Sequence, residues 1–191
     1  MAGVIGVSDH GGWAVLVTAG RDGTLLDRRR VELVDEGLPK IPLHSKGQLL
    51  PLDEVTELVE RVRASAGRHA KLVLDELAVA VPGPILGIAL RQCPDLPPTI
   101  AEQITNYRAC NVADWVMYRK ALATAAEARG WPVHWYDTRQ VQAVASQVLG
   151  VKSLDAHFVK LRRSIGPPWG QDHRMAMAAA VAGFASANMR P

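Results

Sequence analysis

Short apolar stretches separated by turn residues predict three β-strands in the first 34 residues. Residues 4–9 are almost continuously apolar, as expected of a central strand that is buried on both faces. Residues 13–18 are rich in aromatic and β-branched side chains, and an Asp-Gly turn signal then leads into a third strand at 24–34. Three consecutive arginines at 28–30 place charge on both faces of that third strand, which favours an edge position. We therefore expect an antiparallel meander whose first strand lies deepest.

The rest of the chain alternates between helical and strand patterns. Helical spacing of apolar residues covers residues 53–66, 72–81, 111–129, 138–149, 154–162 and a last helix from residue 171. Strand patterns cover 85–90 and 131–136, and the former follows a helical crossover and should pair in parallel. The long loop at 36–51 contains His44, Ser45 and Lys46, and long loops often have a functional role. This order predicts one α/β domain over 1–191, a mixed five-stranded sheet with three antiparallel opening strands, flanked by helices.

Composition excludes some classes of protein but does not identify the function. With 191 residues, 48% hydrophobic and 21% charged, the chain can bury a core, and a largely disordered chain is excluded. The longest apolar run, residues 175–189, falls short of the roughly 20 residues of a membrane span, so we expect no span and a cytoplasmic location. Cys93 and Cys110 lack zinc-ligand spacing and are expected to be reduced thiols. The net charge of +3 permits an anionic partner without requiring one.

Asp9 is the most unusual residue of the first strand. It shares a strand face with Ile5 and Val7, so a carboxylate ends an otherwise apolar row. Burying a carboxylate without partners costs several kcal/mol, and something must compensate it. Asp9 is therefore either a metal ligand or the first residue of an Asx-type turn.

Asp172 opens the last predicted helix, on a stripe that continues through Met175, Ala179 and Ala182. Small alanines allow the helix to approach a sheet closely. The carboxylate is either a metal ligand or a stabiliser of the helix N-terminus through the macrodipole. The helix is apolar on more than one side, which indicates deep burial or a partner.

The opening strand pair at 4–17, the order of elements and the closing Asp-His-Arg-Met-Ala-Met-Ala at 172–178 resemble the ribonuclease H-like superfamily, in particular its RuvC-like resolvase branch. The resemblance implies that an Asp on the first strand and an Asp opening the last helix meet over the sheet and bind catalytic Mg²⁺ or Mn²⁺. Asp9 and Asp172 would be these ligands. Two such ions would activate a water and stabilise the leaving oxygen in phosphodiester cleavage.

The resemblance also implies a Glu or Asp at the end of the fourth strand, where this chain has Ala-Leu-Arg-Gln-Cys-Pro at 89–94. Arg91 occupies the expected neighbourhood. The nearest acids are Asp95, which we take as the third candidate catalytic residue, and Glu102. His10 and His173 are adjacent to the two aspartates and offer a further metal ligand or a general base, and we assign His173 as a candidate ligand.

Basic residues cluster in sequence around the last connector. Candidates to hold phosphates and stack on a base are Lys160, Arg162, Arg163, Arg174 and Trp169. The alternative interpretation is a solvated helix face beside a core tryptophan.

Two main functions follow from these patterns. The first is a divalent-metal-dependent nuclease that cuts structured or branched nucleic acid, DNA rather than RNA, and a homodimer is compatible with it. The second is a catalytically silent ribonuclease H-like module that binds nucleic acid or assembles with proteins. A third, the actin-like phosphotransferases, needs two such domains around a nucleotide and would require a dimer.

Overall fold

The structure is a computed structural model that describes residues 1–187. Its five strands are β1 (Gly3–His10), β2 (Trp13–Ala19), β3 (Leu25–Glu32), β4 (Ile85–Arg91) and β5 (Val133–Tyr136). Its seven helices in this range are α1 (Pro42–Lys46), α2 (Leu52–Ala80), α3 (Ile100–Thr105), α4 (Tyr107–Glu127), α5 (Val141–Leu149), α6 (Leu154–Ile165) and α7 (Gln171–Ala187). The last two residues of the apolar run at 175–189 lie outside the described residues.

The strands form one sheet in the order β3-β2-β1-β4-β5. The pairs β1–β2 and β2–β3 are antiparallel, whereas β1–β4 and β4–β5 are parallel. The predicted mixed α/β sheet is therefore confirmed, with β1 at its centre and the arginine-bearing β3 at an edge. β1 lies at the centre because almost all of its residues are buried, which requires cover on both faces of the strand.

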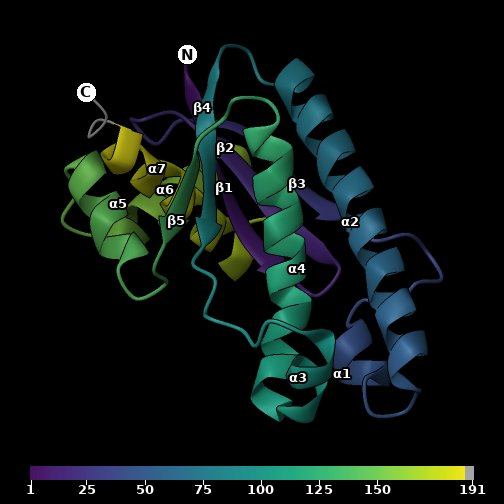
Figure 1. The fold of residues 1–191 in the computed structure, drawn as a ribbon. Helices are drawn as coiled ribbons and strands as arrows, with labels where there is room; N and C mark the ends of the chain where they lie inside the picture. The colour runs from purple at the N-terminus through teal and green to yellow at the C-terminus, as the bar shows by residue number, and fades with distance from the viewer. Residues whose placement is uncertain (188–191) are drawn as a thin grey trace.

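Helices cover both faces of the sheet (Figure 1). One core lies between the sheet and α2 and α4, and a second lies between the sheet and the group of α5, α6 and α7. The short helices α1 and α3 lie together at the foot of α2 and α4, where a small third cluster packs them (Figure 1). The result is a three-layered molecule in which each face of β1 meets a different set of helices.

Two helix boundaries differ from the sequence-based prediction. The two helical segments on either side of Gly67 form one continuous helix, α2, because buried residues such as Ala66 and Ala70 hold both halves against the core. That packing outweighs the roughly 1 kcal/mol helix cost of a glycine. Helix α4 begins four residues before the predicted start, because Asn106 caps it through its side-chain oxygen, which accepts from the Ala109 amide at 3.0 Å.

Helix α7 approaches β1 so closely that only glycine fits at position 6. A Cβ atom there would lie 1.9 Å from the carbonyl oxygen of Ala176 and 2.3 Å from the amide nitrogen of Ala180. Residues 176–184 are buried throughout, so the apolar character of this helix is explained by packing within the chain. In the described residues, no helix is both long and apolar enough to cross a membrane.

Candidate functional site

The alternation of side chains along β1 decides which residues face α7. Val4 belongs to the core beneath α7, and Ser8 and His10 point to the same side. Ile5 and Val7 belong to the opposite core, beneath α2 and α4. Because neighbouring strand residues point to opposite faces, Asp9 lies with Ile5 and Val7 rather than with Ser8.

A polar cluster therefore joins β1 to the start of α7 at Asp172. The Ser8 hydroxyl donates to Asp172 Oδ1 at 2.9 Å, and His10 Nε2 lies 2.8 Å from the same oxygen. Burial raises the pKa of Asp172, but the bonds from His10 and Ser8 outweigh it, and the pKa lies below its ordinary value. His10 also stacks on Trp13, with ring centroids 4.0 Å apart, and this fixes the plane of the imidazole.

The three side chains do not form a nucleophilic triad. In such a triad the histidine accepts the serine proton and the carboxylate orients the histidine. Here Ser8 donates to Asp172 itself, and in the described residues no hydrogen bond joins Ser8 to His10. The cluster thus ties β1 to α7 without activating the serine.

Asp9 is held on the other face by Arg119 of α4. Arg119 Nε donates to Asp9 Oδ2 at 2.6 Å, and the side chains of Asp9 and Arg119 are 0% and 4% exposed. Arg91 Nε lies 3.9 Å from Asp9 Oδ1, and within residues 1–187 this oxygen has no hydrogen-bond partner. This buried ion pair is the compensation that a carboxylate in this strand requires.

The prediction that Asp9 and Asp172 share a metal ion does not agree with this geometry. The face shared by Ile5, Val7 and Asp9 was assigned correctly, but α7 packs on the other face. The strand position that contacts Asp172 is Ser8, one residue earlier. A shift of one residue along a strand moves a side chain to the other face of the sheet, and so the two carboxylates meet partners on different faces.

Arg91 occupies the end of β4, where the resemblance implies an acid. It pairs in register with Tyr136, and its guanidinium acts to lower the pKa of the Tyr136 hydroxyl. Burial raises the pKa of Tyr136 to about 12, with a further increase from Asp9, and the hydroxyl donates to the Val7 carbonyl at 2.7 Å. Tyr136 is therefore a neutral donor that links β5 to β1.

The other acids proposed for the third position have different roles. Asp95 is exposed in the loop after β4 and lines a cavity against α2 and α4. Glu102 accepts from the Thr99 amide and hydroxyl, which completes a capping box at the start of α3. In the described residues, no interaction joins either carboxylate to Asp172.

His173 also makes a hydrogen bond at the start of α7. Its Nδ1 accepts from the Gly170 amide at 3.3 Å, and burial, followed by the charge of Arg28, lowers its pKa. Across the described residues, no group of three or more His, Cys, Asp or Glu side chains is arranged to hold a metal ion. The donor set around Asp172, one carboxylate with a hydroxyl and an imidazole, does not fit a pair of Mg²⁺ ions, which prefer several carboxylate oxygens.

The comparison with solved structures assigns the fold. RuvC of T. thermophilus in complex with a Holliday junction substrate matches with a TM-score of 0.52 and 18% identity, over 99% of this chain and 96% of that chain. A second structure of Thermus thermophilus RuvC matches with a TM-score of 0.47 and 18% identity, over 98% and 96%. The chain has the ribonuclease H-like fold of RuvC. No family profile matches the sequence, and no curated protein matches it significantly.

At 18% identity the likeness to RuvC establishes the fold alone, and the chemistry of this chain depends on its own residues. On the RuvC-like sheet, the side chains that meet the start of α7 are Ser8 and His10. Ser8 is not among the residues predicted from sequence, and neither is Arg119, whose partner Asp9 is 110 positions away. The available signal for Ser8 was Gly6, since a glycine two positions earlier on the same strand face marks where a helix can approach.

The basic residues predicted from sequence lie on the outside of this RuvC-like fold. Lys160, Arg162 and Arg163 are exposed on α6, and Arg174 is exposed on the first turn of α7. Within the described chain, none of the four forms an ion pair. Burial lowers the pKa of His157 on the same helix, and the nearby Lys160 lowers it further.

Trp169 does not belong to that exposed surface. It is buried, with its ring centroid 6.0 Å from that of Phe158 and 6.0 Å from that of His173. The prediction that it stacks on a base is therefore replaced by the alternative, a core tryptophan. Its place beside α6 and α7 helps to fix the connector between them.

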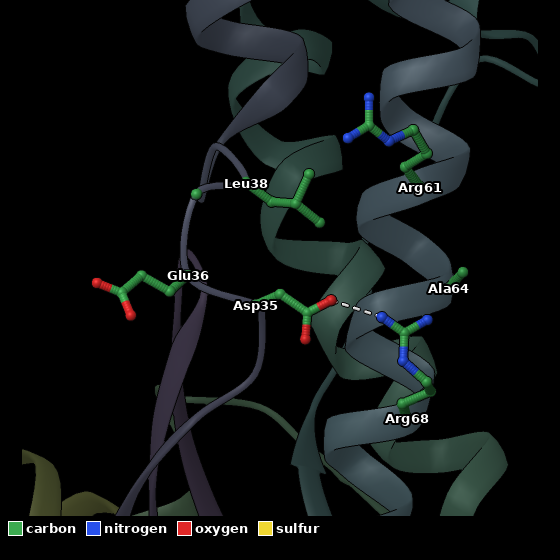
Figure 2. A pocket seen from close by; sticks show the side chains of 7 residues that line it. Asp35, Glu36, Leu38, Arg61, Ala64 and Arg68 are labelled. Atoms are coloured by element: carbon green, nitrogen blue, oxygen red, sulfur yellow. Dashed lines mark hydrogen bonds and ion pairs between the residues drawn. The ribbon is translucent and has the colours of Figure 1, made fainter.

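A separate polar pocket lies between the loop after β3 and α2, with a volume of about 470 Å³. Figure 2 shows Asp35 directed at Arg68, while Arg61 lies on the next turns of the helix with no partner drawn. A hydrogen bond from His69 is the main reason that the pKa of Asp35 is lowered. The Asp35 backbone N–H donates to Ser65 Oγ at 2.8 Å. These contacts hold the loop against α2, so the role of Asp35 is structural.

Proposed function

We propose that this protein is a catalytically silent ribonuclease H-like module that binds nucleic acid through the exposed basic side of α6 and the start of α7. The absence of catalysis is supported by the identity of the side chains around Asp172 and at the end of β4. There, Asp172 meets a serine and a histidine, and β4 ends in Arg91. One carboxylate is insufficient for the two-metal chemistry that cleaves phosphodiesters.

Unpaired charge supports the binding part of the proposal. Many other basic side chains of the chain, such as Arg68 and Arg139, are paired with acids, whereas Lys160, Arg162 and Arg163 are exposed without an acidic partner in the described structure. Free cations on one side of a domain attract the phosphate backbone and release its counterions on binding. Branched DNA is the preferred ligand, because the similar RuvC structure holds a Holliday junction substrate.

The experiment is a fluorescence-anisotropy titration with a labelled four-way junction and a linear duplex of equal length, with EDTA and then with Mg²⁺ or Mn²⁺. We expect binding in EDTA that weakens steeply with salt, and no cleavage with either metal. The double variant Lys160→Gln/Arg163→Gln should lower the salt slope by about 2, close to 0.9 for each lost phosphate contact. Arg139→Gln is the matched control, because that exposed arginine is already paired with Asp137 and lies outside the basic side.

The results separate the alternatives. Metal-dependent cleavage that Asp172→Asn abolishes would overturn the silent module and restore the nuclease with Asp9, Asp172 and Asp95. Absence of binding to both DNA forms, at low salt and with correctly folded protein, would overturn the nucleic-acid part. A homodimer is a further prediction, and sedimentation velocity at several concentrations tests it.

A further inference from the structure

A cavity of about 720 Å³ begins just after β4 and lies on the α2 and α4 side of the sheet, whereas Asp172 lies on the α7 side. It is bounded by α2, by the loop at 93–98, by Gln103 of α3 and by three turns of α4. Its volume falls within the range of small-molecule sites, roughly 300–1,000 Å³. Its walls include the apolar side chains of Leu96, Val116 and Met117, which suit a flat ring.

Gln103 supplies a buried acceptor that has no partner. The residue is 7% exposed, and its side-chain nitrogen donates to the Pro97 carbonyl at 2.7 Å, which fixes the orientation of the amide. Its Oε1 is closed to solvent and accepts no hydrogen bond in the described structure. A buried acceptor without a donor costs free energy, and an N–H or O–H group of a bound molecule would remove that cost.

Positively charged side chains also line the cavity. Lys120 is exposed on its wall and forms no ion pair in the described structure. Arg63 of α2 also lines the cavity, and in the described residues its acidic partner is Glu60 of the same helix, an exposed pair of the weak kind. The cavity wall therefore carries cations from two different helices, which suits an anionic group.

We propose that this cavity binds a nucleoside monophosphate, with a base N–H on Gln103 Oε1 and the phosphate between Lys120 and Arg63. Ala113, beside α3, and Lys120 are seven residues apart on α4, which is about 10 Å along a helix. This length suits a ring at one end and a phosphate at the other. Asp95 is exposed on the wall and offers an acceptor for a second donor of the base.

The ligand can be a free nucleotide or the phosphorylated end of a strand, since both present the same groups. The site is independent of the basic side of α6, so it stands or falls separately from the proposed function. Variants of Lys160 and Arg163 are expected to leave nucleotide binding unchanged, whereas variants of this cavity are expected to leave junction binding unchanged.

The test is isothermal titration calorimetry of the full chain with AMP, CMP, GMP and UMP at low salt. We expect saturable binding of at least one of them with a Kd below about 1 mM. Gln103→Leu should weaken it about tenfold, and Lys120→Gln about threefold to tenfold. Lys46→Gln, an exposed lysine of α1 outside the cavity, is the control and should change nothing. The nucleoside alone and inorganic phosphate alone should each bind more weakly than the nucleotide.

A 5′-phosphorylated decanucleotide distinguishes the two sources of ligand. If it displaces the nucleotide, the site takes a strand end, and if it does not, the site takes the free nucleotide. The proposal is overturned if none of the four nucleotides binds, or if neither cavity variant weakens binding. Circular dichroism checks the fold, and Lys120→Gln decides the outcome if Gln103→Leu does not fold, because Lys120 is exposed.

Discussion

The ion pair between Asp9 and Arg119 makes the sharpest prediction about this protein. We expect Asp9 to be a structural residue that holds α4 against β1, and the substitution that tests this is Arg119→Met. Methionine keeps much of the aliphatic bulk of arginine and removes its charge and its donor to Asp9 Oδ2. The change leaves a carboxylate whose side chain is 0% exposed with Arg91, at 3.9 Å, as the nearest cation.

The expected cost follows from this burial. Removing one partner of a buried ion pair typically costs 3–5 kcal/mol, because the remaining charge is uncompensated. Arg91 compensates Asp9 in part, so we expect about 3 kcal/mol from Arg119→Met. For a chain of this length that loss lowers Tm by about 6–12 °C, since each kcal/mol shifts it by roughly 2–4 °C.

The assay is urea unfolding at pH 7.5, followed by tryptophan fluorescence and by far-ultraviolet circular dichroism. The double variant Asp9→Leu/Arg119→Met removes both charges and should recover most of the lost stability, which gives a coupling free energy of about 2 kcal/mol. Arg139→Met is the matched control. Arg139 is 87% exposed and pairs with Asp137 on the surface, so its loss should cost less than about 1 kcal/mol.

Two results would refute this reasoning. An Arg119→Met variant as stable as the control would show that the Asp9 charge is not held by Arg119. An Asp9→Asn variant that keeps full stability but loses a metal-dependent cleavage would show that Asp9 acts on substrate. Either result would return Asp9 to the catalytic role implied by the resemblance.

Three further predictions concern Asp114, Arg28 and Ser8. Burial raises the pKa of Asp114 to about 6 against the bonds from the α1 amides, so the folded state binds the proton more tightly and loses up to about 3 kcal/mol as pH rises from 4 to 7. The difference in unfolding free energy between wild type and Asp114→Asn should fall over this window, and a flat difference contradicts the assignment. Arg28 donates to the four carbonyls of residues 165–168 and so holds the connector between α6 and α7, and Arg28→Met should cost about 2 kcal/mol and speed proteolysis of this connector. An unchanged rate of proteolysis would contradict this role. Ser8→Asp would place a second carboxylate against Asp172, so Mn²⁺ should raise the Tm of the variant and not of wild type; equal responses would argue against this geometry.

The fold could be predicted largely from local patterns. The strand residues, the edge position of the arginine-rich strand and the parallel crossover follow from periodicity and turn chemistry, and all appear in the structure. The exceptions are places where packing overrides a local signal. Gly67 does not interrupt α2, and α4 begins at Tyr107 rather than at residue 111, because Asn106 caps it.

The candidate site could be predicted only in part. Asp172 was found, because an acid at the start of an alanine-rich helix is visible in sequence. Its partners were not, since they depend on which face of β1 the helix covers. The roles of Arg91 and Arg119 were hidden for the same reason, as both act on Asp9 from elements far along the chain.

By itself, the sequence determined that Asp9 alternates with Ser8 and His10 and that a small-residue helix would pack on the sheet. Only the tertiary structure decided that this helix lies over Ser8 and His10, which leaves Asp9 to Arg119 on the opposite face. The physical reason is the two-residue period of a strand. Periodicity divides the side chains into two sets, but the pairing of each set with a helix depends on contacts more than 100 residues apart.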